Sequence, residues 1–222
     1  MSAEKPERIR GDSILRAITD DGSFRVITAE TTETVRDAIA AQKAKGPLAA
    51  AFGELLTGTL IVREAMAPQL RVQGLVRASA GRVSLVADSF PDGSNRGIVN
   101  LGAAGKPSDF EGFGAGSLLQ MMRSLPNGSM QQGVVQIPEP GGISAGLMAY
   151  MQESEQVVSM IAVTTIMSGD DVVAAGGYLV QLLPEASRGA LMVMTERLAD
   201  FTESGSPIAA SPDELLGELL YG

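Results

Sequence analysis

A serine flanked by glycines, in the run Gly142-Ile143-Ser144-Ala145-Gly146, is the part of this sequence that most suggests catalysis. The run matches the G-x-S-x-G nucleophile elbow and lies between a predicted strand and a predicted helix, as that motif requires. One hypothesis is therefore a serine hydrolase that uses Ser144. The alternative is a glycine-rich helix start with Ser144 near the N-cap.

The chain has no histidine and no cysteine in its 222 residues, which restricts the chemistry open to it. A serine nucleophile needs a base to accept its proton, and histidine is the usual one. The only lysines are Lys5, Lys43, Lys45 and Lys106, and none lies in a predicted active-site context. Catalytic triads, disulfides and Cys/His zinc sites are excluded. We therefore favour the helix start and predict no catalytic residue and no cofactor.

A second glycine-rich run, Gly112-Phe113-Gly114-Ala115-Gly116, resembles a phosphate-binding loop. It precedes a predicted strand, whereas pyrophosphate is normally held at a helix N-terminus. We favour a close backbone approach or a bulge entering the strand at Ser117. A small-molecule-binding module that uses residues 112–116 remains a third functional hypothesis.

Acidic residues are the remaining candidates for chemistry. Glu153 and Glu155 are two apart at a predicted helix end, a spacing that does not place them on one face. Four aspartates in predicted loops could ligate calcium weakly but lack EF-hand spacing, so solvated turns are the favoured interpretation: Asp88, Asp92, Asp170 and Asp171. No metal site is predicted.

Composition narrows the possible partners. The net charge is −9 and the sequence pI is about 4.6, so the chain repels nucleic acid and anionic lipid. Residues 1–8 lack a secretory apolar region, and the apolar run 47–62 contains Glu54 and is too short to span a bilayer. We expect a cytoplasmic protein that binds neither nucleic acid nor membrane. Eleven methionines and an aromatic content of 4% predict an adaptable aliphatic core.

The residue pattern predicts an α+β chain. Strands are expected at 23–28, 69–78, 82–90, 97–101, 117–123, 133–137, 157–167 and 172–183, with turns at 79–81, 91–93, 126–128 and 168–171. Helices are expected at 31–43, 48–66, 144–154, 187–201 and 211–221, the last with a capping box at Ser211. The second helix is apolar around its circumference and should be buried.

These elements predict a single large domain with twisted, mostly antiparallel sheets built from hairpins, a buried helix and a helical C-terminal appendage. The expected division is a core at residues 1–185 and a C-terminal helical segment at 186–222.

Several ordered landmarks resemble one known family. Tyr150 is followed by Ser154-Glu155-Gln156, and then by the run Ala174-Ala175-Gly176-Gly177-Tyr178-Leu179-Val180-Gln181-Leu182-Leu183-Pro184. Weaker landmarks agree in order: Glu54-Leu55-Leu56, Arg96-Gly97, the Gly114/Gly116 pair and Gln132-Gly133-Val134-Val135. From about Asp12 to Tyr221 the chain resembles the heat-shock-protein-33 family of redox-regulated, ATP-independent holdase chaperones.

The resemblance implies an ATP-independent holdase that binds unfolded or aggregation-prone polypeptides under oxidative or heat stress. It also implies a homodimer, for which exposed strand edges make domain swapping a route. Gly176-Gly177 would permit a close backbone approach or a bulge, and we favour a packing role over client contact. Client contact is expected on apolar surface of the sheets and of the helices at 187–221.

This sequence departs from the family pattern in one respect. Family members carry a C-terminal module in which four cysteines hold zinc, and oxidation there exposes the client-binding surface. No zinc ligand can be carried over to any residue here, because the chain has no cysteine. The sequence is either a shortened form of a longer protein, which we favour, or a natural member without the switch. In both cases the chain as given should lack oxidative gating.

Overall fold

The computed structural model describes residues 11–79, 83–102, 105–184, 186–203 and 212–221. Their elements, in chain order, are β1 (Ser13–Ile18), β2 (Phe24–Glu30), α1 (Thr32–Gln42), α2 (Gly46–Met66), β3 (Val72–Arg77), β4 (Ser84–Ser89), β5 (Asn95–Asn100), a 3-10 turn (Pro107–Asp109), β6 (Leu118–Ser124), β7 (Met130–Gln136), α3 (Ile143–Glu153), β8 (Ser159–Ser168), β9 (Asp171–Leu182), α4 (Arg188–Glu203) and α5 (Pro212–Tyr221).

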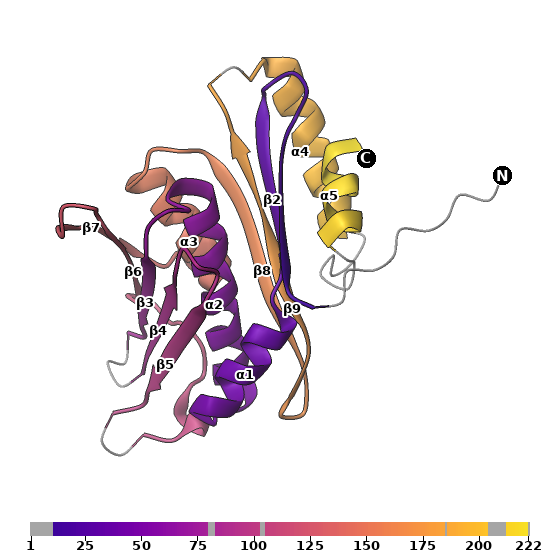
Figure 1. The fold of residues 1–222 in the computed structure, drawn as a ribbon. Helices are drawn as coiled ribbons and strands as arrows, with labels where there is room; N and C mark the ends of the chain where they lie inside the picture. Colours follow the sequence, from indigo (N-terminus) through magenta and orange to yellow (C-terminus); the bar gives the residue numbers. More distant parts are fainter. Residues whose placement is uncertain (1–10, 80–82, 103–104, 185, 204–211, 222) are drawn as a thin grey trace.

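Two antiparallel sheets pack on either side of one helix. The first has the strand order β1-β2-β9-β8 and the second the order β5-β4-β3-β6-β7. Figure 1 shows α2 between the sheets, with α4 and α5 on the far side of the first sheet. The predicted α+β class with hairpin-built antiparallel sheets is confirmed.

Helix α2 is the centre of the structure. Pro47 occupies its first turn, where proline's fixed φ suits a helix and its missing N–H is not needed. Sixteen of its 21 residues are buried, because the helix is apolar on all sides and has a sheet on two of them. Phe52, Leu55 and Ile61 are fully enclosed. The predicted burial of this helix is confirmed.

A second, smaller apolar cluster lies on the other face of the first sheet. It contains four sheet residues and three residues of the C-terminal helices: Phe24, Val26, Tyr178, Val180, Met194, Leu215 and Leu219. The larger cluster around α2 shares none of these residues. The first sheet is therefore apolar on both faces, and its outer face is covered by α4 and α5.

The sequence patterns missed one strand, and the structure decides between the two interpretations left open for Gly176-Gly177. β1 was not predicted, because Ser13-Ile14-Leu15-Arg16-Ala17-Ile18 does not alternate clearly, yet it pairs with β2 at the sheet edge. The β-bulge between β8 and β9 lies at Ile166/Met167 and not at Gly176-Gly177. The predicted turn at 79–81 and the Ser211 cap fall partly or wholly outside the described residues.

Gly177 confirms the other half of that prediction, the close backbone approach. A Cβ added there would lie 2.5 Å from the carbonyl oxygen of Ala162 and 2.8 Å from Cγ1 of Val163. Since the oxygen belongs to the neighbouring strand's backbone, the clash cannot be relieved by rotating a side chain.

We predict that Gly177→Ala lowers the free energy of unfolding by ~2–4 kcal/mol, because β8 and β9 must move apart. Gly189→Ala is the matched control, since its nearest neighbour would be 3.8 Å away, and it should not destabilise the chain. Urea unfolding of both variants measures this. Equal stability of the two variants would show that the strands accommodate the methyl group.

Glu54 of α2 is a partly buried carboxyl group with no hydrogen-bond or ion-pair partner among the described side chains. Burial raises its pKa to about 7. The folded state therefore binds a proton that the unfolded state releases, so stability should fall as pH rises from about 4.5 towards 7.

Glu54→Gln should remove this pH dependence. We predict a gain in unfolding free energy of ~2 kcal/mol at pH 8 and little change at pH 5. Denaturant titrations at the two pH values test it. A gain of the same size at both pH values would mean that Glu54 is not protonated in the folded chain.

Candidate functional site

Ser144 lies in the first turn of α3, two residues after the N-cap Gly142. Its hydroxyl accepts a hydrogen bond from the N–H of Val163 at 3.0 Å and donates one to the Val163 carbonyl oxygen at 3.4 Å. The helix-start interpretation is thus confirmed in position, and the hydroxyl ties α3 to β8, with no basic side chain hydrogen-bonded to it among the described residues.

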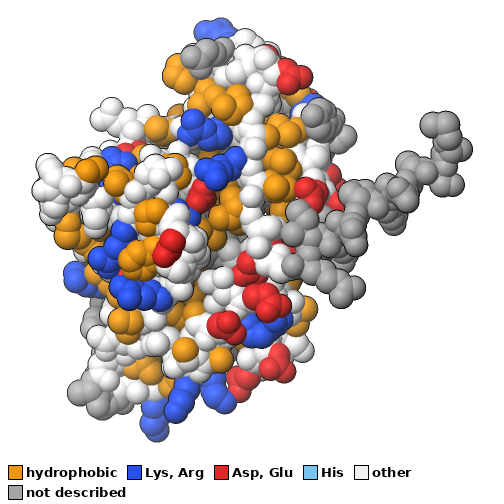
Figure 2. Space-filling view, in the orientation of Figure 1, with side chains coloured by type: hydrophobic (Ala, Val, Ile, Leu, Met, Phe, Trp, Pro, Cys, Tyr) orange, Lys and Arg blue, Asp and Glu red, His pale blue; other side chains and the backbone are white. Residues whose placement is uncertain are grey.

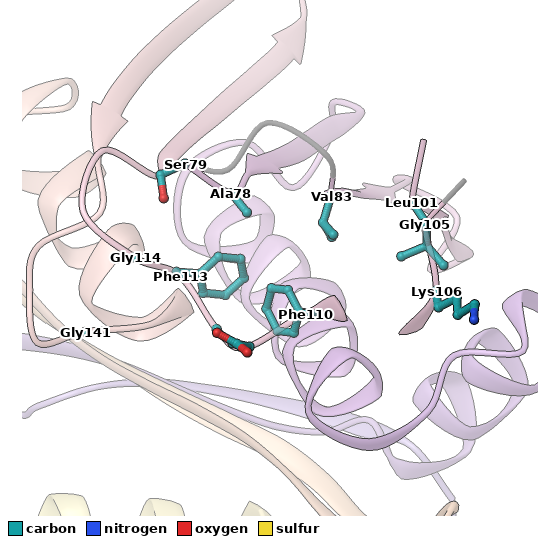
Figure 3. A pocket seen from close by; sticks show the side chains of 12 residues that line it. Ala78, Ser79, Val83, Leu101, Gly105, Lys106, Phe110, Phe113, Gly114 and Gly141 are labelled. Atoms are coloured by element: carbon teal, nitrogen blue, oxygen red, sulfur yellow. The ribbon is translucent and has the colours of Figure 1, made fainter. Parts of the chain in front are cut away.

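The 112–116 loop precedes β6 and borders a cavity of about 800 Å³. Phe110 and Phe113 meet edge to face there, with ring centroids 5.1 Å apart. In Figure 3 the Lys106 side chain extends away from these two rings. Glu111 also lines the cavity and would repel a phosphate. The loop is therefore a poor anion site, although it does border a cavity.

The four aspartates considered as weak calcium ligands do not come together, and the expected solvated turn is wrong for Asp88, which is buried within β4. Arg71 donates hydrogen bonds to both carboxylate oxygens of Asp88, at 2.8 and 2.9 Å. The Asp170 carboxylate forms an ion pair with Lys45 at 2.6 Å. Asp92 accepts hydrogen bonds from Ser94 in its turn. Within the described ranges, no three acidic side chains are grouped as a metal site.

Glu155 has a structural task that its neighbour Glu153 does not share. The Tyr150 hydroxyl donates a hydrogen bond to Glu155, and Arg123 of β6 lies 3.3 Å from the other carboxylate oxygen. Burial and the Glu155 carboxylate together raise the pKa of Tyr150 above its usual range. The triad joins the end of α3 to the second sheet. The Ser154-Glu155-Gln156 landmark is thus a packing feature.

Sequence reasoning missed a polar cluster at the end of α2. Arg63 donates to Ser89 Oγ at 2.8 Å and to the Pro68 carbonyl oxygen at 3.0 Å. Its neighbour Glu64 contacts both Arg63 and Arg16, the latter at 2.9 Å. The signal was available, since adjacent opposite charges at the end of an apolar helix imply a buried pair. The cluster fixes the end of α2 between the sheets.

The most distinctive surface of the molecule is the outer face of the first sheet. Val26 pairs with Val180, which pairs with Met160, and Tyr178 pairs with Ala162 in the adjacent row. Leu215 and Leu219 of α5 and Met194 of α4 cover these rows. We name this face, with Phe24, Val26, Tyr178 and Val180 at its centre, the covered face.

Hydrogen bonds join the two helices to the sheet and to each other. Thr28 donates a hydrogen bond to the Pro212 carbonyl oxygen at 3.0 Å, and Arg197 donates to the Leu220 carbonyl oxygen. On α4, Met192 and Val193 stay 67% and 49% exposed. The two helices thus meet the covered face through an apolar cluster, and their own outer side is partly apolar.

Comparison with known proteins places this arrangement in a family. The family model described as "Hsp33 protein" matches residues 12–222. The chain belongs to the Hsp33 family. A 33 kDa chaperonin of Listeria welshimeri is 29% identical over 222 residues, covering 95% of this chain and 75% of the relative. That of Syntrophotalea carbinolica is 31% identical over 221 residues, covering 95% and 76%.

The fold of a solved Hsp33 agrees. The crystal structure of the 33 kDa chaperonin from Thermotoga maritima matches with a TM-score of 0.79 at 20% identity, over 93% of this chain and 74% of that chain. This Hsp33-family chain is thus a chaperone homologue and not an enzyme. The hydrolase alternative based on Ser144 is not supported.

The residues of this Hsp33-family chain do not fit the family's cysteine-held zinc. It has no cysteine and no histidine, and the described residues include no metal-binding group. A switch that depends on thiol oxidation is therefore lacking here. No described helix is long and apolar enough to cross a membrane.

Ser144→Ala should test the structural assignment of this hydroxyl. We predict a loss of ~1 kcal/mol in unfolding free energy, because one backbone N–H and one carbonyl of β8 lose their side-chain partner. Urea unfolding measures the loss, and turnover of a p-nitrophenyl ester measures hydrolysis in parallel. An esterase activity that disappears in the variant would restore the catalytic interpretation.

Proposed function

We propose that this chain is an ATP-independent holdase that binds unfolded polypeptides on the covered face when α4 and α5 are displaced. The observation that best supports this proposal is the second apolar cluster, which is separate from the core around α2. Displacing the helices would expose Phe24, Val26 and Val180 without disturbing that core. A holdase needs apolar, adaptable surface and no positioned nucleophile.

The energetics favour such a displacement. α5 has 10 residues, a length at which a helix is marginal in water without packing partners, and α4 with 16 residues is only just above that range. Only Met194, Leu215 and Leu219 of their described side chains are fully buried hydrophobics. Each contributes about 1.5–3 kcal/mol, whereas ordering each backbone residue costs about 1–2 kcal/mol. The cover is therefore weakly held compared with α2.

The proposal includes a division of the chain and a place of action. We propose that residues 1–185 form the chaperone core and residues 186–222 a separable cover. It would act in the cytoplasm under oxidative or heat stress, with unfolded proteins as clients. Because the chain lacks the cysteine switch, peroxide should not control its activity.

We also propose a homodimer in which the two copies exchange α4 and α5. The helices contact the sheet through one cluster, so a partner's helices could make the same contacts. With exchanged helices, the covered face would be buried by the same residues of the partner copy, and displacing those helices would expose it in the same way.

Two sets of variants should shift holdase activity in opposite directions. Leu215→Ala with Leu219→Ala removes about 2–5 kcal/mol per site from the cover and should lower the chain-to-client ratio needed to suppress aggregation. Gly217 of α5 has open space at its Cβ, so Gly217→Ala strengthens the helix by about 1 kcal/mol and should raise that ratio. Light scattering of a thermally unfolding client enzyme measures both effects.

The same assay, run with and without peroxide, tests whether oxidation controls aggregation suppression by this chain. Equal protection in both conditions is expected, because no thiol is present to be oxidised. Protection that appears only after peroxide would contradict the proposal, and so would equal protection by the weakened and strengthened covers.

A further inference from the structure

The second sheet has an outer face that no described helix covers, with a mainly apolar central row and mostly polar residues in the rows beside it. Its outward rows follow from the strand register, because alternate residues point to opposite faces. The middle row crosses all five strands as Ile98, Val86, Leu75, Gln120 and Val134. In Figure 1 the helices α1, α2 and α3 all lie on the inner side of this sheet. We name this surface the open face.

Several large apolar side chains of the open face are exposed to solvent. Ile98 and Val134 are 58% and 52% exposed at its two edges, and Leu118 and Met130 are also exposed. Exposed apolar side chains gathered on one face usually mark an interaction site. β5 and β7, which form the edges, each have one side without a strand partner in the described residues.

The charges on this face are mostly positive, although the whole chain is acidic. The three central outward rows contain Arg77, Arg96 and Asp88. Asp88 is neutralised by Arg71 at 2.8 Å and faces Arg96 at 3.5 Å, while Arg77 has no ion-pair partner among the described residues. Basic side chains predominate on the left of Figure 2, over this sheet, and acidic ones gather on its right.

This charge distribution selects the occupant. A second copy packed face to face would bring two positively charged surfaces together, which is unfavourable. An extended polypeptide with apolar and acidic side chains matches both the apolar row and the arginines. The row spans roughly 19 Å across five strands, a length covered by about six extended residues.

We propose that the open face is a second client-binding surface, always accessible, that prefers unfolded segments in which apolar residues alternate with acidic ones. This inference rests on the proposed holdase function and adds a substrate preference to it. The covered face would bind client after the helices move, whereas the open face would bind at first encounter.

Fluorescence anisotropy with two labelled peptides of about ten residues tests the preference. One alternates leucine with glutamate and serine, and the other has lysine in place of glutamate. The full chain should bind the acidic peptide about fivefold or more tightly than the basic one. The double variant Ile98→Gln with Val134→Gln should bind the acidic peptide about fivefold more weakly, because two apolar contacts are lost.

Two further variants serve as a control and as a test of the charge preference. Val173→Gln on β9 removes a side chain that is also 56% exposed but lies on the other sheet, and it should bind as the unchanged chain does. Arg77→Glu should abolish or reverse the preference for the acidic peptide. Equal binding of both peptides by the unchanged chain would overturn the proposal, as would a response of Val173→Gln equal to that of the open-face variant.

Sedimentation velocity and the aggregation assay separate the remaining outcomes. A dimer that dissociates in Ile98→Gln with Val134→Gln would assign the open face to a second copy and overturn the inference. Aggregation suppression that responds to the Leu215 and Leu219 variants while peptide binding ignores the open-face variants would overturn this inference alone. Loss of the proposed function would instead appear as no suppression by any form of the chain.

Discussion

The structure depends on one requirement, that a helix apolar around its whole circumference must be enclosed. α2 meets it by lying between two antiparallel sheets, with Phe52, Leu55 and Ile61 fully buried. The close fit extends to the strands, since a Cβ on Gly97 would lie 2.5 Å from the Phe52 ring and one on Gly74 would lie 2.5 Å from Thr59. The Arg96-Gly97 landmark is therefore a position where the second sheet must approach this helix.

Enclosing α2 between sheets leaves two outer sheet faces, and the chain treats them differently. The face of the first sheet carries Val26, Tyr178 and Val180 under two helices. The face of the second sheet carries a mixed row of apolar and polar residues with no helix over it. The molecule thus combines a rigid centre with apolar outer surfaces. This combination suits binding of unfolded chains more than catalysis, which needs groups held in fixed geometry.

The sequence predicted most elements because their signals are local. The β4–β5 and β6–β7 turns contain Pro-Asp-Gly and Pro-Asn-Gly, and α2 begins at Gly46-Pro47. β1 was missed because an edge strand with Arg16 in the middle is specified by its partner more than by its own pattern. The bulge at Ile166/Met167 likewise depends on how two strands fit together.

Surfaces were harder to predict than elements. Nothing in the sequence separates the cluster under α4 and α5 from the main core, because both are built from the same aliphatic residues. The outward row of the second sheet required the register of five strands before its residues could be seen as neighbours. The absence of cysteine and histidine, in contrast, is read directly from the sequence and leaves no thiol or imidazole side chain in this chain.

The central claim is that α4 and α5 form a cover that opens while the enclosed α2 stays folded. Native-state hydrogen exchange compares the two regions in one experiment. The account predicts that amides of α4 and α5 exchange through an opening that costs several kcal/mol less than global unfolding, whereas α2 amides exchange only on global unfolding. If the amides of all three helices share one opening free energy and one denaturant dependence, the cover does not open separately and the account is contradicted.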